Sequence, residues 1–269
     1  MRKKDRQTAV VTGASSGIGK AIAFSLKKAG YDVIGTSRNS EKISNKIDGI
    51  RYEQLDCGIE SSVDAFIKRI GETDILVNNA GRSQIGAAED VPMKKVRDLF
   101  EVNFFGLVRL TQGFLPGMRR KGGGQIINIS SMSGVVGVSF TPYYCATKFA
   151  VEGFSESLRK EVYPFGINVT LIEPGYIGTG LKQEPHIDEK SPYYRYLINF
   201  KTVRDGKIDS GPDAFVVARK VMSIINKKNP RARYAVGGDA PLTAFLLRLL
   251  PNRLIEKAQR RKFKIHRVK

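Results

Sequence analysis

The chain has 269 residues, of which 41% are hydrophobic and 26% are charged, and its formal net charge at pH 7 is +19. This balance allows a sizeable hydrophobic core and excludes a chain that is disordered throughout. The two cysteines, Cys57 and Cys145, supply neither a disulfide framework nor the spacing of a metal site, and we expect no bound metal. Together with the lack of a visible signal peptide, they favour a cytoplasmic protein.

Short apolar runs alternate with amphipathic helical patterns along the chain. Strands are predicted at residues 8–13, 32–38, 51–56, 74–81, 124–130, 167–175 and 233–237. Helices are predicted at residues 18–31, 61–70, 93–114, 143–163 and 213–228. Because buried parallel strands read as continuous apolar runs and their helical connections are right-handed, the pattern predicts an α/β fold. We expect a single-domain, doubly wound Rossmann-type parallel sheet with helices on both faces.

The segment TGASSGIG joins the first predicted strand to the first predicted helix. Its three glycines allow a sharp turn and a close approach of the backbone, while the helix N-terminus offers free N–H groups. This arrangement predicts the pyrophosphate site of a dinucleotide. The residues assigned to it are Gly13, Ser15, Ser16, Gly17, Ile18 and Gly19. The alternative is a glycine turn with a purely structural role.

The end of the second predicted strand indicates which dinucleotide binds. An acidic residue at this position contacts the ribose hydroxyls of NAD, whereas an arginine accommodates the 2′-phosphate of NADP. This chain has Ser37 and Arg38 there, so no carboxylate repels the phosphate and a guanidinium can bind it. We therefore predict NADP as the cofactor. The alternative is that Arg38 is only a solvated surface charge.

Two adjacent tyrosines precede a lysine in the segment TPYYCATK, at the start of a predicted helix. Residues four apart share a helix face, so Tyr144 and Lys148 project together and Tyr143 does not. A phenol has an ordinary pKa of about 10, and a neighbouring cation lowers it toward the range useful for acid–base catalysis. Tyr144 is therefore the candidate acid or base, although this spacing alone is common in helices.

Several motifs in chain order resemble those of the short-chain dehydrogenase/reductase family over residues 8–180. They are TGASSGIG, NNAG, EVNFFG, ISSMSG, YCATK and EPGYIGT. The resemblance implies four catalytic residues, which fall on Asn103, Ser131, Tyr144 and Lys148. Ser131 is chosen over Ser130 because it stands thirteen residues before Tyr144, as in the family, and Ser133 remains a second candidate.

The resemblance also implies a role for each residue. Tyr144 protonates a carbonyl oxygen as hydride from the nicotinamide reaches the carbon, and Ser131 stabilises the charge on that oxygen. Lys148 lowers the pKa of the phenol and binds the nicotinamide ribose, while Asn103 holds a water. Further cofactor contacts are implied for Asp56, Asn79, Ala80, Gly81, Tyr144, Lys148, Pro174, Gly175, Ile177 and Thr179. Outside the Tyr–Lys pair, stabilisation of a turn or strand end is an equal alternative for these residues.

Residues 181–210 are rich in glycine, proline and charge, and a loop of this length is typically a functional lid. Aromatic side chains in and near this segment predict a pocket with apolar walls for a lipophilic ketone, aldehyde or alcohol. They are Phe140, Tyr143, Tyr193, Tyr194, Tyr196 and Phe200. Steroid and retinoid dehydrogenases in the family favour the same class of substrate. The alternative is that these aromatics only pack the lid onto the sheet.

Residues 241–269 form a basic, amphipathic tail. Its apolar face is predicted from the helical spacing of Leu242, Phe245, Leu246 and Leu249. Such a tail can contact an anionic membrane surface peripherally, which would make the protein membrane-associated. The favoured alternative is that this face packs on the lid or on a partner subunit.

These features predict a dinucleotide-binding catalytic domain at residues 1–240, followed by the tail. The expected activity is NADP(H)-dependent interconversion of a carbonyl and a primary or secondary alcohol, with reduction favoured because cells usually hold this cofactor reduced. The alternative is a regulatory protein that binds the cofactor without turnover. No nucleic-acid partner is expected, since only the net charge points to one. The family resemblance further implies a homodimer or homotetramer.

Overall fold

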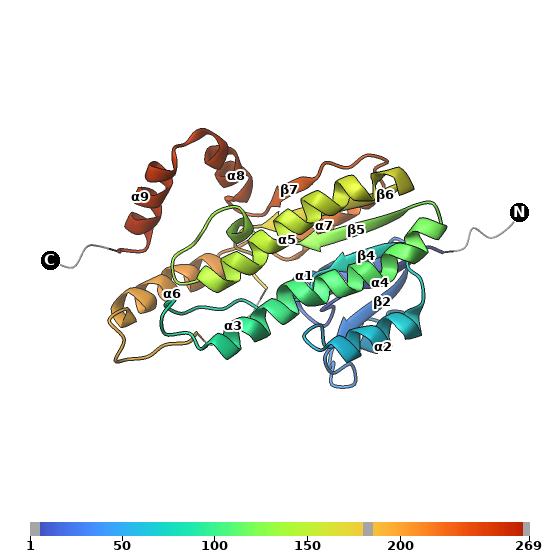
Figure 1. Ribbon diagram of the computed structural model, residues 1–269, viewed down its shortest axis with the longest axis horizontal. Coiled ribbons are helices and arrows are strands. Elements are labelled where there is room, and N and C mark those ends of the chain that lie inside the picture. The colour runs from blue at the N-terminus through green and yellow to red at the C-terminus, as the bar shows by residue number, and fades with distance from the viewer. Residues whose placement is uncertain (1–5, 180–184, 266–269) are drawn as a thin grey trace, which may run out of the picture.

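The computed structural model describes residues 6–179 and 185–265. Within these ranges, seven parallel strands form one sheet in the order β3-β2-β1-β4-β5-β6-β7 (Figure 1). The strands are β1 (Thr8–Val11), β2 (Asp32–Ser37), β3 (Arg51–Gln54), β4 (Ile75–Asn78), β5 (Gly124–Ile129), β6 (Ile167–Pro174) and β7 (Arg233–Val236). Each strand lies inside one of the predicted apolar runs, and the predicted parallel sheet is confirmed.

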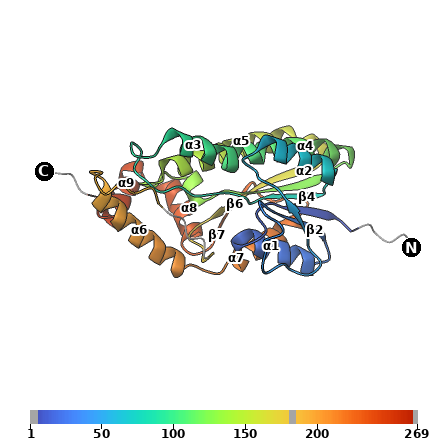
Figure 2. The same ribbon diagram turned by 90° about the horizontal axis from the view of Figure 1, so that it is seen from below.

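The central strands are buried on both faces because helices cover both sides of the sheet. Along β1, Ala9 and Val11 pack into one hydrophobic cluster and Val10 into another, as the alternation of strand side chains requires. The helices over the first cluster are α1 (Gly17–Lys28) and α7 (Phe215–Ile225). Those over the second are α2 (Glu60–Ile70), α4 (Gly106–Arg120) and α5 (Pro142–Glu161). Figure 2 shows these two helical layers on opposite sides of the sheet.

One long helical segment contains a widened turn that the sequence did not reveal. The helix α3 (Met93–Phe100) continues into α4 through the π-helical turn Glu101–Phe105. A single helix ending near residue 114 was predicted, whereas α4 runs to Arg120. Single π turns are rare and often lie at functional sites. This one carries Asn103, which is buried beside the cavity described below.

The lid region contains a helix, α6 (Tyr194–Asp209), where a long loop was predicted. Residues 180–184, including the start of the predicted lid, lie outside the described residues. Packing stabilises α6, since Leu197 and Phe200 are buried and the Phe200 ring lies 4.8 Å from the Phe263 ring. The helix therefore owes its stability to tertiary contacts rather than to a periodic apolar face, which explains why the sequence pattern missed it.

Two further helices follow β7, namely α8 (Ala240–Leu249) and α9 (Asn252–Lys262). Figure 1 shows α6, α8 and α9 gathered at the end of the molecule opposite the N-terminus. Phe263, at the end of α9, is buried in a cluster with Leu197 and Phe200 of α6, so the C-terminal segment is attached to the lid helix. Among the described residues, every helix is too short or too polar to cross a membrane.

Candidate active site

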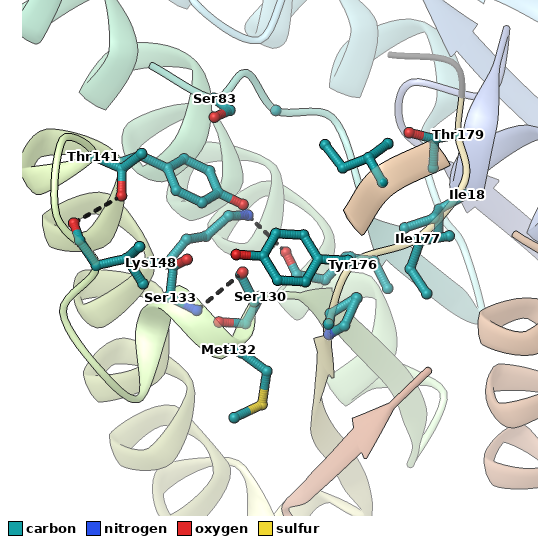
Figure 3. A pocket seen from close by; sticks show the side chains of 18 of the residues that line it. Ile18, Ser83, Ser130, Met132, Ser133, Thr141, Lys148, Tyr176, Ile177 and Thr179 are labelled. Atoms are coloured by element: carbon teal, nitrogen blue, oxygen red, sulfur yellow. Dashed lines mark hydrogen bonds between the residues drawn. The ribbon is translucent and has the colours of Figure 1, made fainter. Parts of the chain in front are cut away.

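A cavity of about 680 Å³ opens where the carboxyl ends of the strands meet α6, α8 and α9. Figure 3 shows side chains that line it, among them Lys148, Tyr176 and Ile177. Ligands of doubly wound sheets bind outside the carboxyl ends of the strands, so this position is typical of a cofactor site. The predicted residues that line the cavity are Gly13, Ser15, Ser16, Gly17, Ile18, Ser37, Arg38, Asp56, Asn79, Ala80, Gly81, Ser131, Tyr144, Lys148, Pro174, Gly175, Ile177 and Thr179. Gly19 and Asn103, which were also predicted, are not part of its wall.

The turn between β1 and α1 brings bare backbone to the cavity. Gly13 and Gly17 adopt positive φ angles of 66° and 52°, which side chains other than hydrogen disfavour. A Cβ on Gly17 would lie 3.3 Å from Cβ of Thr179, and one on Gly13 would lie 3.1 Å from Cα of Ala80. The N-cap residue Ser16 makes no side-chain cap, so the first N–H groups of α1 are free to bind an anion. This cradle fits the pyrophosphate of a dinucleotide.

A second layer of hydrogen bonds holds this turn in place from behind. The Asn79 side-chain amide donates to the carbonyl of Thr12 at 2.9 Å, and the Thr12 hydroxyl accepts from the backbone N–H groups of Asn79 and Ala80 at 2.9 Å. A side chain on Gly19 would collide with the carbonyl of Gly13 and with Asn79. Gly19 therefore allows α1 to pack on the turn, and its predicted contact with the cofactor stays a prediction.

Ser37 and Arg38 lie at the rim where β2 ends, as the prediction of an NADP site requires. Arg38 is exposed, and none of the ion pairs formed among residues 6–179 and 185–265 includes it. Its guanidinium is therefore available to an anionic ligand. The neighbouring Asp56 accepts a hydrogen bond from the Gly58 N–H at 2.9 Å, which fixes the turn after β3.

Tyr144 and Lys148 both face the cavity from the first turns of α5. The Lys148 ammonium lies 5.9 Å from the centre of the Tyr144 ring and donates to the carbonyl of Ile129 at 2.8 Å. The Tyr143 hydroxyl instead donates to the carbonyl of Ala88 at 2.7 Å and lies outside the cavity wall. Helical spacing thus separates the two tyrosines as expected.

Burial dominates the acid–base behaviour of this pair. Desolvation raises the pKa of Tyr144, although a hydrogen bond with Ser131 and the charge of Arg204 act to lower it. Desolvation lowers the pKa of Lys148 to about 8, partly opposed by the charge of Glu152. The sequence led us to expect a lowered pKa for Tyr144. The protein surroundings give the opposite direction, because the expectation ignored the desolvation of the phenol.

The neighbouring serines have different surroundings. The Ser131 hydroxyl shares a hydrogen bond with Tyr144 and accepts one from the Ser133 N–H at 3.1 Å, which caps a short 3₁₀ turn. Ser130 is buried, and its hydroxyl has no hydrogen-bond partner among the described residues. A Cβ on Gly134 would lie only 2.8 Å from that hydroxyl, which places it toward the loop. Ser133 also lines the cavity, as Figure 3 shows.

Asn103 lies behind the cavity wall and acts on its neighbours. Its side-chain nitrogen donates to the carbonyl of Arg82 at 2.8 Å and to the Thr147 hydroxyl at 3.1 Å, while its oxygen accepts from the Arg82 N–H at 2.8 Å. Both amide hydrogens are therefore used by the protein. In this geometry the Asn103 side chain fixes the segment after β4 against α5, and the water-binding role expected from the sequence stays a prediction.

Most of the aromatic residues predicted to wall the pocket lie elsewhere. Phe200 lines the cavity, but the others in that group do not. Tyr193 and Tyr194 are each 37% exposed, and Phe140 packs against Phe200 with ring centres 5.7 Å apart. On α6 the helical turn directs Phe200 into the cavity and leaves Tyr194 partly exposed, while Phe140 and Tyr143 lie on the segment that leads into α5 and contact Phe200 and Ala88 instead.

Several residues of the cavity were missed by sequence reasoning. Tyr176, Arg204 and Lys262 line it, together with apolar residues of α8 and α9. The apolar residues are Leu246, Leu247, Leu250, Leu254, Ile255 and Ala258. Apart from Tyr176, which lies in the segment EPGYIGT, they belong to no motif, and only the folded arrangement brings them together with the rest of the cavity wall. Among the described residues, His, Cys, Asp and Glu form no cluster that could hold a metal ion.

Comparison with known proteins gives the same type of fold. A sequence profile described as short chain dehydrogenase matches residues 7–190. The Bacillus subtilis protein named uncharacterized oxidoreductase YusZ is 36% identical over 266 residues, which cover 92% of this chain and 95% of the relative. A 3-ketodihydrosphingosine reductase from Bacteroides thetaiotaomicron is 36% identical over 86% of this chain and 88% of its own length.

Among solved structures, a short-chain dehydrogenase from Streptomyces avermitilis aligns with a TM-score of 0.82 and 36% sequence identity. The alignment covers 97% of this chain and 98% of that one, so it extends beyond the core sheet into the C-terminal helices.

Proposed function

The chain belongs to the short-chain dehydrogenase/reductase family, and from this membership we propose that it is an NADP(H)-dependent reductase of a lipophilic carbonyl compound. One observation carries the proposal. The Tyr144 phenol and the Lys148 ammonium project into the same cavity that reaches the glycine turn at the start of α1. A general acid is thereby placed beside a site suited to a dinucleotide.

The residues of the chain divide the chemistry between them. The chemistry that NADPH supplies when bound is a hydride for the carbonyl carbon. Tyr144 donates its phenolic proton to the carbonyl oxygen, and its raised pKa keeps that proton in place at neutral pH. Ser131, hydrogen-bonded to the phenol, donates to the same oxygen and stabilises its developing charge. The positive charge of the Lys148 ammonium also stabilises the negative charge that develops on this oxygen.

The cofactor preference rests on the end of β2. The positive-φ glycines of the first turn would hold the pyrophosphate, and Arg38 would pair with a 2′-phosphate. The preceding residue is Ser37 and not an acidic residue, so no carboxylate there repels the phosphate. Comparing the dissociation constants of NADPH and NADH tests this assignment. We expect Arg38→Gln to weaken NADPH binding by roughly tenfold and to leave NADH binding unchanged. Equal affinities in the wild type would contradict it.

The lipophilic character of the substrate rests on α8 and α9, which cover the outer part of the cavity with leucine and isoleucine side chains. A pocket with such walls binds ligands through apolar burial. The relative named 3-ketodihydrosphingosine reductase is in keeping with a long-chain carbonyl substrate.

The central test is a screen of ketones and aldehydes that follows NADPH absorbance, repeated with two matched variants. Tyr144→Phe removes the proposed acid and should lower turnover by about 10²–10⁴-fold. Tyr143→Phe removes the adjacent hydroxyl, which donates to the carbonyl of Ala88 outside the cavity wall, and should leave turnover near the wild-type level. Cofactor binding without turnover of any carbonyl would instead favour a regulatory protein.

The tail supports a peripheral membrane contact. Leu242, Phe245 and Leu249 are 62%, 59% and 63% exposed, so these residues of the predicted apolar face do not pack on the lid, whereas Leu246 lines the cavity. Packing of this face on a partner subunit, the other part of the favoured alternative, stays a prediction. The basic residues of α9 lie next to this face along the chain, and they are Arg253, Lys257, Arg260, Arg261 and Lys262. This combination fits an anionic bilayer surface. Flotation with acidic vesicles should carry the wild type but not a Leu242→Ser/Phe245→Ser/Leu249→Ser variant.

Exposed phenylalanines on the long helices support self-association. Phe105 and Phe149, at the start of α4 and on α5, are 42% and 47% exposed. Burying them between two copies would give the homodimer or homotetramer expected from the family. Light scattering of the purified protein tests this, and a monomer at micromolar concentration would contradict it.

A further inference from the structure

Two cationic side chains lie in the cavity outside every motif used so far. Arg204 comes from α6 and Lys262 from the end of α9, and both line the cavity with Tyr176. The Lys262 ammonium lies 5.2 Å from the centre of the Tyr176 ring, and the Arg204 side chain is only 12% exposed. The Arg204 side chain is thus largely buried, which is rare for a cation, whereas the Lys262 side chain is exposed and reaches the cavity from its edge. Their presence among apolar walls needs an explanation.

Protein carboxylates do not neutralise these charges fully. Arg204 pairs with Asp205 at 3.1 Å, but the same carboxylate also binds Lys201 at 2.7 Å, so one anion serves two cations. Lys262 has no carboxylate within 4.0 Å in the described part of the chain. Asp239, which also lines the cavity, acts on Lys262 from a longer range. This side of the cavity thus retains an excess of positive charge.

The excess charge lies close to the reacting groups. Arg204 lines the same cavity as Tyr144 and Tyr176. Desolvation raises the pKa of both phenols and the charge of Arg204 opposes this rise, so its guanidinium is within electrostatic reach of the phenol that donates the proton. The walls beyond it are the leucine and isoleucine side chains of α8 and α9. Cations near the catalytic phenol and hydrocarbon farther away match an amphiphile whose anionic group stands close to its carbonyl.

We propose that Arg204 and Lys262 form an anion-binding subsite, and that the preferred substrate is a long-chain carbonyl compound with a carboxylate, phosphate or sulfonate near the carbonyl. The planar guanidinium of Arg204 can bind two oxygens of such a group, while the Lys262 ammonium contributes a point charge. The substrate class rests on the proposed reductase function. The subsite itself does not, because binding of an anion can be measured without turnover.

Direct binding is measured by calorimetry on the full-length protein with decanoate, decyl phosphate, decyl sulfate and decan-1-ol. At least one of the anions should bind roughly tenfold more tightly than the alcohol, because it pairs with charges that are otherwise unsatisfied. The strongest of the three identifies the anion chemistry. Arg204→Gln and Lys262→Gln should each remove most of this preference and leave decan-1-ol binding unchanged. Lys257→Gln is the control, since Lys257 is on α9 but outside the cavity wall.

Turnover gives a second readout. We expect kcat/KM for a long-chain oxo acid to exceed that of its methyl ester, and Arg204→Gln to bring the two values together. Equal binding of all four probes by the wild type, or a preference unchanged in both variants, overturns the subsite. If ketones are reduced without an anion preference, the proposed function stands and the subsite falls. If decanoate is preferred but no carbonyl is reduced, the subsite stands and the proposed function falls.

A separate measurement assigns Arg204 to substrate or cofactor. The subsite predicts that Arg204→Gln leaves the dissociation constant of NADPH within about twofold of the wild type, because Arg38 and the glycine turn hold the cofactor phosphates. A large loss of NADPH affinity with an unchanged preference for decanoate would place Arg204 in the cofactor site and overturn the proposal.

Discussion

The two halves of the cavity are built in different ways. The half at the turn between β1 and α1 presents backbone, with positive-φ Gly13 and Gly17 and the free N–H groups of a helix. The half at α6, α8 and α9 presents side chains, which are apolar apart from a few charged groups. A backbone surface constrains the sequence strongly, whereas a side-chain surface can change without disturbing the sheet. Cofactor binding and substrate choice should therefore be separable by mutation.

Lys148 lies where the two halves meet, and its substitution should have the largest effect. Lys148→Met removes the ammonium beside Tyr144 and should lower turnover by about 10²–10⁴-fold. The same change should stabilise the fold. Burial lowers the pKa of Lys148 from 10.5 to about 8, so its charged form destabilises the protein below pH 8 by up to about 3 kcal/mol.

This destabilisation disappears as the pH rises through 10.5, where the unfolded chain also loses the proton. The hydrogen bond to Ile129 is lost in Lys148→Met, which offsets about 1 kcal/mol of the gain. Urea unfolding at pH 7 and at pH 10 measures the net change. A gain in the free energy of unfolding at pH 7 that shrinks at pH 10 is expected, and a loss at both pH values would contradict the argument.

The backbone half can be broken by one methyl group. Gly17→Ala places a Cβ 3.3 Å from Thr179 at a residue with a positive φ. The variant should weaken NADPH binding by roughly tenfold or more, because it moves the turn that receives the pyrophosphate. Gly30→Ala is the matched control, since Gly30 has a φ of 90° and no atom within 4 Å of an added Cβ. Both variants should lose about 1 kcal/mol of stability through backbone strain.

Fluorescence titration with NADPH separates these two effects. Only Gly17→Ala should lose affinity, and decanoate binding should be retained in both variants. An equal loss of NADPH affinity in Gly30→Ala would show that general strain, and not the cradle, controls cofactor binding.

The same contrast explains what the sequence could predict. The backbone half depends on glycines, and the junction of the two halves depends on a Tyr–Lys spacing of four. Both are local features of the sequence, and Gly13, Tyr144 and Lys148 all lie in the cavity wall. The strands were predicted because continuous apolar runs encode burial on both faces. Local patterns could not show that desolvation raises the pKa of Tyr144, or that protein groups bind both amide hydrogens of Asn103.

The side-chain half was not predicted, because its residues meet only through tertiary packing. The helix α6 has no clear apolar face, and its position depends on the contact of Phe200 with Phe263, 63 positions along the chain. Arg204 and Lys262 belong to no motif and are separated by two helices and a strand. Long-range contacts of this kind leave no periodic signal in the sequence.

The pH dependence of reduction should test the role of Lys148, which lies where the two halves of the cavity meet. As Lys148 loses its proton near pH 8, the positive charge beside the phenol disappears, and kcat/KM for reduction should fall by up to tenfold per pH unit above about pH 8. The charge of Glu152 raises the pKa of Lys148, so Glu152→Gln should move this fall to lower pH.

Glu156→Gln is the control for that shift. Arg233 binds Glu152 and Glu156 at 2.9 Å each, so both variants lose an ion pair with the same guanidinium. Glu152, and not Glu156, is the carboxylate that raises the pKa of Lys148, so the Glu156 variant should keep the wild-type profile. Identical shifts in the two variants would trace the effect to Arg233 and not to Lys148.

The smallest effect is expected in the attachment of the side-chain half. Phe263 is buried against Phe200 and fixes the end of α9, so Phe263→Ala should release α9 and expose the outer cavity. We expect kcat/KM for long-chain carbonyls to fall about fivefold, since part of the apolar wall is lost, while short-chain turnover and NADPH affinity are unchanged. Faster hydrogen exchange at residues 252–262 would report the release.

Phe245→Ala is the control, because it removes an exposed ring on α8. It should change neither kcat/KM for long-chain carbonyls nor the hydrogen exchange of residues 252–262. An equal loss for short and long chains would mean that α9 supports the catalytic groups themselves, and the two halves of the cavity would not be separable.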